Sequence, residues 1–374
     1  MPPPLPDLAA AIRTLNLAVA DKATPGAAFG LLLDARESTA AVGHLDFTAH
    51  SPAATPTSLY DLASLTKVVA TASAAMLLHD RSALDLDAPL ASILPAFNPA
   101  ADALRSRVTL RHLLTHSSGL PAHQYLYRTC RTRDQAIAAC LSMPLTNAPG
   151  LVSDYSDPGF ILLGLALETI SAEPLDRFCA REIFTPLGMA DTLFNPPASL
   201  LPRIAPAGPD SGLRTDASGV PAPIHGQVHD ENAALLGGVA GHAGLFSTVP
   251  DLLRFARCIL SGGLTSNNKR LFRADTISLF TTRAATPPGT SRALAWDTPT
   301  PPSSSGTRFS PHSVGHLGYT GCSLWLDLDR SLAVVLLLNR TCRPADGPPA
   351  EKEPIRGLRP AFHDALLAAL PTAV

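Results

Sequence analysis

Several features that would point to particular classes of protein are scarce in this 374-residue sequence. Charged residues make up 16% of it, and 29 Lys and Arg nearly balance 31 Asp and Glu. No excess of charge therefore favours a nucleic acid or an anionic membrane surface as a partner. Aromatic residues make up 5%, which argues against a surface that stacks carbohydrates or single-stranded nucleic acid. Hydrophobic residues reach 46%, so a sizeable core is expected.

Long apolar runs and an export signal are also missing. The longest apolar candidate, residues 332–338, is the size of a strand and far below the roughly 18 residues of a membrane-spanning helix. The N-terminus has neither the basic nor the apolar region of a secretory signal. The six cysteines show no CxxC pairing, which favours reduced thiols in the core. We therefore expect a cytoplasmic protein that enters no membrane. Its oligomeric state is left open.

Strand-like segments lie near both ends of the chain, and helical patterns dominate from about residue 60 to 280. The expected elements near the ends are a helix over 7–20, strands at 27–33, 40–45, 323–328 and 332–338, and a closing helix at about 358–370. Residues 284–313 are expected to form a long irregular connection. This order predicts one sheet assembled from the two ends of the chain, with a helical region inserted.

The strongest local signal is Ser64-Leu65-Thr66-Lys67, at the start of an apolar helix expected to run to about Leu78. Positions i and i+3 share one face of a helix, so Ser64 and Lys67 would point into the same space. A buried lysine with a lowered pKa can take the proton of a serine hydroxyl and make it a nucleophile. The alternative is a capping serine beside a solvated lysine. The chain has four lysines against 25 arginines, which favours a role that needs proton exchange.

Two later segments place polar groups beside apolar elements. Tyr155 lies on a predicted loop, ahead of a helix in which Asp157 would be the N-cap and Pro158 the first residue. Its phenol could project into a cleft. His316 lies in a glycine-rich segment, 315–321, where the backbone could approach a bound molecule closely. A structural role is the alternative for each of these side chains.

In this order the three segments resemble the motifs of the penicillin-recognising serine hydrolases, which include class C beta-lactamases, DD-peptidases and related esterases. Similar stretches at 59–63, 110–120 and 186–192 extend the resemblance over about residues 20–345. It implies an α+β fold of the beta-lactamase/transpeptidase type, in which an antiparallel sheet from both termini is flanked by helices and carries an inserted, mainly helical domain. The sheet domain would comprise residues 1–60 plus 305–374, and the inserted domain 61–304.

The resemblance also implies roles for the matching positions. Ser64 would be the acylated nucleophile, Lys67 its proton partner, and Tyr155 the group that shuttles the proton to and from the leaving group. The acylation base stays open between Lys67 and Tyr155. His316 would order the proton network, and the backbone N–H groups of Ser64 and Tyr319 would form the oxyanion hole. No cofactor and no metal are expected.

Two positions depart from the family's Tyr-x-Asn and Lys/His-Thr-Gly patterns. Asp157 stands where the family has Asn and exchanges an amide donor for an acceptor that can carry charge. Leu317 replaces a threonine whose hydroxyl helps to bind the carboxylate of penicillins and D-alanyl peptides. The lost donor should discriminate against such substrates by a few kcal/mol. We therefore expect esterase-like activity on a small ester or amide. The alternatives are hydrolysis of D-amino-acid or cell-wall-derived peptides, as by a DD-peptidase or beta-lactamase, and a catalytically silent binding protein of the same fold.

Residues 225–242 admit three interpretations. The segment could bind zinc, line the cleft or be purely structural, and its candidate ligands are His225, His229, Asp230, Glu231 and His242. Their spacing matches no metal signature, so lining of the cleft is preferred. The predicted substrate-binding residues are accordingly Asp157, Gly318, His229, His242 and Arg340. His116 and Asp61, which flank the motifs, are expected to belong to the scaffold.

Overall fold

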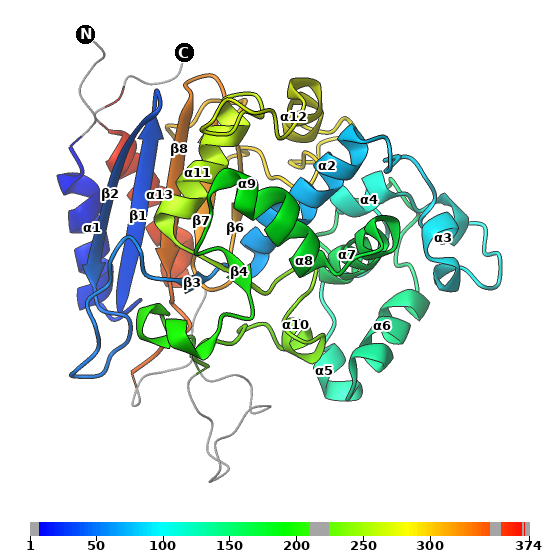
Figure 1. Cartoon of the computed structure of the whole chain (residues 1–374), viewed down its shortest axis with the longest axis horizontal. Helices are drawn as coiled ribbons and strands as arrows, with labels where there is room; N and C mark the ends of the chain where they lie inside the picture. Colours follow the sequence, from blue (N-terminus) through cyan, green and yellow to red (C-terminus); the bar gives the residue numbers. More distant parts are fainter. Residues whose placement is uncertain (1–6, 209–223, 345–352, 369, 371–374) are drawn as a thin grey trace.

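A five-stranded antiparallel sheet joins the two ends of the chain in this computed structural model (Figure 1). The structure describes residues 7–208, 224–344, 353–368 and 370. The strands lie in the order β2-β1-β8-β7-β6, with the bounds Gly26–Leu33 (β1), Arg36–Gly43 (β2), Val314–Leu317 (β6), Ser323–Asp327 (β7) and Leu332–Leu338 (β8). Because β1 pairs with β8, the N-terminal hairpin and the C-terminal strands form one sheet. The predicted α+β architecture is thereby confirmed.

Helices cover both faces of this sheet. On one face α1 (Ala9–Ala20) packs with α13 (Glu353–Leu367), and the rings of Phe29 and Phe362 meet at 5.2 Å between centroids. On the other face α11 (Val249–Leu260) packs against β1 and β8. Every residue of these two strands is buried, which explains why both are continuous apolar runs in the sequence.

The middle of the chain forms a helical region beside the sheet (Figure 1). Its helices are α2 (Ser73–Asp80), α3 (Leu90–Ile93), α4 (Leu110–Leu114), α5 (Leu126–Thr129), α6 (Arg133–Ser142), α7 (Asp157–Ser171), α8 (Leu175–Cys179), α9 (Thr185–Leu187), α10 (Glu231–Leu235) and α12 (Ala274–Thr281). A small sheet, β3 (Tyr60–Asp61), β5 (Leu245–Ser247) and β4 (Leu193–Phe194), joins the two parts. The division at residue 304 stays a prediction. It does not describe α11, which lies within 61–304 and packs on the large sheet.

Some element bounds differ from the predicted ones. The first hairpin turns at Asp34 and Ala35, which have φ of 48° and 64°, so β2 begins at Arg36 instead of residue 40. Two residues of positive φ form the tight turn that suits the twist of a hairpin. The closing helix begins at 353 instead of 358. Residues 284–313 contain no helix and no named strand, as expected.

The cysteines and the apolar helices bear on two further expectations. All six cysteines are buried and free, as predicted for core thiols. In the part of the chain that the structure describes, no single helix is long and apolar enough to cross a membrane. The two helical segments 157–171 and 175–187, which are bent relative to each other, are together long and apolar enough by length and composition alone.

Candidate active site

Ser64 lies on a strained turn between β3 and the central helix. The 3₁₀ turn Ala63–Leu65 leads into the π-helical segment Lys67–Ala72, which continues as α2. Ala63 has a φ of 46°, a conformation that costs a residue with a side chain about 1–3 kcal/mol and is frequent at functional sites. The buried carboxylate of Asp61 maintains this turn, because its Oδ1 accepts the backbone N–H of Ala63 at 2.8 Å. Its Oδ2 accepts the backbone N–H of His229 at 2.6 Å. Asp61 thus belongs to the scaffold, as expected.

The ammonium group of Lys67 is fully buried among three oxygen atoms. It lies 3.0 Å from Ser64 Oγ, 2.7 Å from Asp157 Oδ1 and 3.2 Å from the carbonyl oxygen of His242. The structure therefore brings Ser64 and Lys67 together as their spacing predicted. Removal of water from this contact strengthens every electrostatic interaction in it.

Lys67 and Asp157 form a buried ion pair that sets the charge of both groups. Burial would lower the pKa of Lys67, but the carboxylate of Asp157 outweighs it and the pKa is raised. Burial would likewise raise the pKa of Asp157, yet the charge of Lys67 and a hydrogen bond from His123 hold it well below its ordinary value. The expected lowered pKa of Lys67 is wrong for the resting protein. The cause is the replacement of an amide by a carboxylate at position 157.

Tyr155 packs between this ion pair and two imidazoles. Its ring centroid lies 4.7 Å from Lys67 Nζ, 4.4 Å from the ring of His116 and 5.9 Å from the ring of His316. Burial raises the pKa of Tyr155, and the nearby charge of Lys67 opposes part of that effect. The phenol is therefore protonated in the resting protein.

Both imidazoles beside Tyr155 are neutral. Burial lowers the pKa of His116 and of His316 well below the ordinary value, and the charges of Lys67 and Arg292 add to this effect. His316 Nδ1 donates to the Leu317 carbonyl at 2.9 Å, which leaves its Nε2 as an acceptor. His116 Nδ1 accepts the backbone N–H of Ser156 at 3.0 Å, which places the proton on its Nε2. His116 thereby supports the loop of Tyr155, in keeping with the predicted scaffold role.

The edge strand β6 closes the other side of the site through a glycine. A Cβ atom added to Gly318 would lie 2.4 Å from the carbonyl oxygen of Leu62, so only glycine allows this approach. The contact places the backbone of Tyr319 near the turn that carries Ser64. Arg340 contacts Tyr319 at both its backbone and its ring. Its Nε donates to the Tyr319 carbonyl at 2.7 Å, and its guanidinium lies 4.4 Å from the centroid of the Tyr319 ring.

A cavity of about 600 Å³ opens over Ser64. Of the predicted site residues it is lined by Ser64, Tyr155, Asp157, His229, His316, Gly318, Tyr319 and Arg340. The substrate contact predicted for His242 needs correction. This side chain is 1% exposed and does not line the cavity, because its Nε2 binds Asp230 Oδ1 at 2.9 Å, while its backbone carbonyl holds Lys67.

The remaining histidines of the 225–242 segment have other contacts. His225 Nε2 lies 2.9 Å from the carbonyl oxygen of Leu201, and the ring of His229 stacks on Tyr319 at 5.7 Å. Within residues 7–208, 224–344, 353–368 and 370, no group of three or more His, Cys, Asp and Glu side chains is placed to hold a metal ion.

Sequence reasoning missed several groups in the cavity, two of which lie beside the charged residues of the site, and it misplaced one helix boundary. His123 and Arg292 line the cavity, and neither belongs to a motif that would have shown it. The N-cap of α7 is Ser156, whose Oγ accepts the N–H of Gly159 at 3.1 Å, whereas Asp157 is the first helical residue. Serine and aspartate are equally good N-caps, and proline fits either of the first two positions. The shift frees the Asp157 carboxylate to pair with Lys67.

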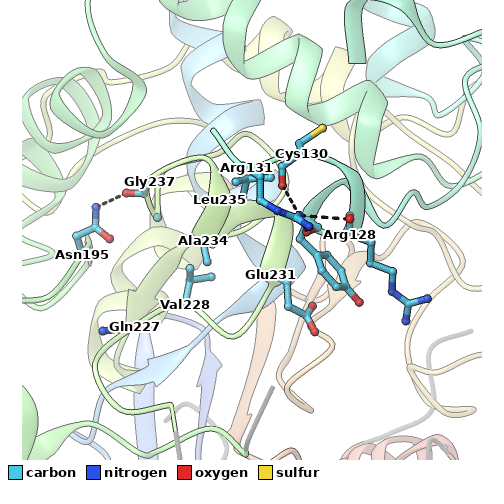
Figure 2. A pocket seen from close by; sticks show the side chains of 12 residues that line it. Arg128, Cys130, Arg131, Asn195, Gln227, Val228, Glu231, Ala234, Leu235 and Gly237 are labelled. Carbon is cyan, nitrogen blue, oxygen red and sulfur yellow. Dashed lines mark hydrogen bonds between the residues drawn. The ribbon is translucent and has the colours of Figure 1, made fainter. Parts of the chain in front are cut away.

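A second hollow, of about 770 Å³, adjoins the active-site cavity (Figure 2). The two share Tyr127 and Glu231 in their linings, and the apolar side of the second is formed by Val228, Ala234 and Leu235. Figure 2 shows Arg131 turned back onto its own loop, where it donates to the carbonyls of residues 127, 128 and 130. The cavity over Ser64 is therefore bordered by a further hollow beside α10.

Comparisons with known proteins agree with this architecture. The family model described as Beta-lactamase matches residues 11–353. A protein of Escherichia coli (strain K12), provisionally named a D-alanyl-D-alanine carboxypeptidase, is 34% identical over 317 residues, which are 79% of this chain and 72% of that protein. An octameric penicillin-binding protein homologue from Pyrococcus abyssi has a TM-score of 0.72 at 21% identity and covers 98% of this chain and 78% of its own. EstCE1, a hydrolase with promiscuous acyltransferase activity, has a TM-score of 0.73 at 20% identity, with coverage of 95% and 98%.

Proposed function

This chain belongs to the beta-lactamase family of serine hydrolases, and on that premise we propose that it hydrolyses a small ester or amide through an acyl-enzyme on Ser64. The observation that carries the proposal is the 3.0 Å contact between Ser64 Oγ and the fully buried Nζ of Lys67. A serine hydroxyl becomes a useful nucleophile only where a base can take its proton, and the amine of Lys67 is in contact with that hydroxyl to act as the base once it has lost its own proton.

The resting charges restrict how the reaction can begin. Lys67 is an ammonium held by Asp157, and Tyr155 is a protonated phenol, so neither can accept a proton as it stands. One proton must leave this pair before Ser64 can be deprotonated. Ser64 Oγ then bonds to the substrate carbonyl carbon, and its proton passes through the pair to the leaving group. Water later attacks the acyl ester by the same route in reverse.

The proposed oxyanion hole consists of the backbone N–H groups of Ser64 and Tyr319. Two contacts support this arrangement. Gly318, the residue before Tyr319, lies against the carbonyl of Leu62 in the turn that leads to Ser64. The hydrogen bond from Arg340 fixes the carbonyl of Tyr319 itself. A fixed donor stabilises the developing negative charge without reorganisation, and the loss of one such donor costs about 3 kcal/mol of transition-state stabilisation. His316, a neutral imidazole whose ring centroid lies 5.9 Å from that of Tyr155, would order the proton network.

Ester hydrolysis is the preferred activity. Leu317 lines the cavity and offers no hydroxyl to a substrate carboxylate, which disfavours penicillins and D-alanyl peptides. A cavity of about 600 Å³ is large enough for a small ester. The adjoining hollow of about 770 Å³ would accommodate the remainder of a longer substrate.

A second candidate is carboxypeptidase activity on D-amino-acid peptides. Among the described residues, four arginines line the cavity, namely Arg292, Arg340, Arg356 and Arg359, and guanidinium groups suit the recognition of a carboxylate. They could replace the hydroxyl that Leu317 lacks. The name given to the Escherichia coli relative points in the same direction.

The two candidates separate in one set of rate measurements. We would compare kcat/KM for p-nitrophenyl acetate, a chromogenic cephalosporin and a peptide ending in D-Ala-D-Ala, using the native protein, Ser64→Ala and the exposed control Ser142→Ala. We expect the ester to react fastest and Ser64→Ala to lose about 10³-fold or more. Faster release of D-alanine than of nitrophenol would favour the second candidate. Turnover that survives in Ser64→Ala would refute both.

A further inference from the structure

The carboxylate of Asp157 is shared between Lys67 and a histidine that lies toward solvent. Oδ1 of Asp157 lies 2.7 Å from Lys67 Nζ, and Oδ2 lies 3.1 Å from His123 Nδ1. The exposed fraction of the side chain rises along this line, from 0% for Lys67 through 14% for Asp157 to 40% for His123. A continuous polar chain thus runs from the nucleophile to the open cavity.

His123 is held in place by its own loop. The loop between α4 and α5 docks on the start of α7, where the N–H of Asp157 donates to the Ala122 carbonyl at 2.9 Å. Ser156 Oγ donates to the Pro121 carbonyl at 2.8 Å. The ring of Tyr125 packs edge-on against the imidazole, with 4.9 Å between centroids. These contacts fix the imidazole beside the carboxylate, so its position is built into the fold.

We propose that His123 is a positioning residue for acylation, whose ring binds the far oxygen of Asp157 and, when it takes up a proton, weakens the hold of that carboxylate on the proton of Lys67. This inference rests on the proposed function, because it concerns how Lys67 becomes able to assist Ser64. One proton leaves Lys67 Nζ and one is gained by His123 Nε2 through exchange with the solvent of the cavity. Asp157 stays ionised between them, so the total charge of the three groups does not change.

The charged surroundings favour this exchange. The groups that face His123 are Asp157, Asp230 and Glu231, all acidic, and its hydrogen bond to Asp157 raises the pKa of the imidazole while partial burial opposes the rise. The polar, titratable and charged groups near Lys67 include Asp157, Tyr155, Ser64, His116, His242, His316 and Arg292. Only Asp157 among them contacts both Lys67 and His123. Protonation of one of these two side chains therefore lowers the proton affinity of the other through the carboxylate that they share.

The test is the pH profile of kcat/KM for p-nitrophenyl acetate in His123→Gln and His123→Arg. The acid limb of this profile is the range in which the rate rises with pH as Lys67 loses its proton. Glutamine cannot take up a proton and so cannot weaken the hold of Asp157 on Lys67. We therefore expect the acid limb to move to higher pH by about one unit, with little change in KM. Arginine carries a permanent positive charge, so we expect the acid limb of His123→Arg to lie at the same pH as that of the native protein or at a lower pH. The matched control is His312→Gln, because His312 Nδ1 also lies 3.1 Å from an aspartate, Asp329 Oδ1, but on the exposed surface away from the cavity. The control should leave the limb unchanged.

Two results would overturn the inference. Limbs that coincide in the native protein, His123→Gln and His123→Arg would show that the charge of the imidazole does not reach Lys67. An equal loss of rate in both variants without a shift of the limb would show a purely structural role. Failure of the proposed function is a separate result, since a fluorophosphonate would then leave Ser64 of the native protein unlabelled.

Discussion

Replacement of Asp157 by asparagine removes the negative charge next to Lys67 while keeping the size of the side chain. The pair lies at 2.7 Å, with Lys67 fully buried and Asp157 14% exposed. At an effective dielectric constant of 20, two charges at this distance attract each other by about 6 kcal/mol. One pKa unit corresponds to about 1.4 kcal/mol, so the loss of even a quarter of this attraction lowers the pKa of Lys67 by about one unit.

The assay is the pH dependence of kcat/KM for a nitrophenyl ester in the native protein and Asp157→Asn. A lower pKa of Lys67 should move the acid limb to lower pH by at least about one unit. Asp329→Asn is the matched control, since Asp329 also pairs with a basic side chain, His312, but on the exposed surface and outside the lining of the cavity. A limb that stays in place or moves to higher pH in Asp157→Asn would refute the assignment of the ion pair as the group that holds the resting proton.

Three further predictions concern the walls of the site. Asp61→Asn should lower the free energy of unfolding by about 1–3 kcal/mol in thermal denaturation and slow labelling of Ser64, because one of two buried backbone N–H groups loses its acceptor. Gly318→Ala should keep the fold, seen in unchanged circular dichroism, but reduce kcat by about 10²-fold, because the new Cβ would collide with the Leu62 carbonyl and displace an oxyanion donor. Arg359→Met should destabilise the loop 318–322, measured as faster amide exchange there, because Arg359 donates to three carbonyls of that loop.

The pH range over which the ion pair stabilises the fold follows from its two pKa shifts. The pKa of Asp157 is lowered by folding, so its contribution is present above the ordinary carboxyl value of 3.8 and is lost as the pH falls through the lowered pKa. The pKa of Lys67 is raised, so its contribution is present below 10.5 and is lost as the pH rises through the raised pKa. The difference in melting temperature between the native protein and Asp157→Asn should therefore be largest between these limits.

The sequence indicates those parts of the site that depend on short-range spacing. Ser64 and Lys67 lie three positions apart, and that spacing alone predicts their contact. The buried strands β1 and β8 are visible as apolar runs because both of their faces are covered. The resemblance to a known family adds Tyr155 and His316, which no local rule would connect to Ser64.

The charge of Lys67 could not be predicted from such local spacing. Its partner Asp157 lies 90 positions away, and the contact exists only once α7 packs against the central helix. Reasoning from burial alone gives the wrong direction for the pKa of Lys67, because burial and the carboxylate act in opposite senses. His123 is missed for the same reason, since an isolated histidine on a loop carries no signal until the loop docks beside Asp157.

The most direct test of the account is the mass of the intact protein after brief reaction with a p-nitrophenyl ester and an acid quench. The account predicts one acyl increment per chain, mapped to the peptide that contains Ser64, absent from Ser64→Ala and strongly reduced in Lys67→Met. An increment that persists in Ser64→Ala, or full acylation of Ser64 in Lys67→Met, would contradict the claim that the buried amine makes this serine the nucleophile.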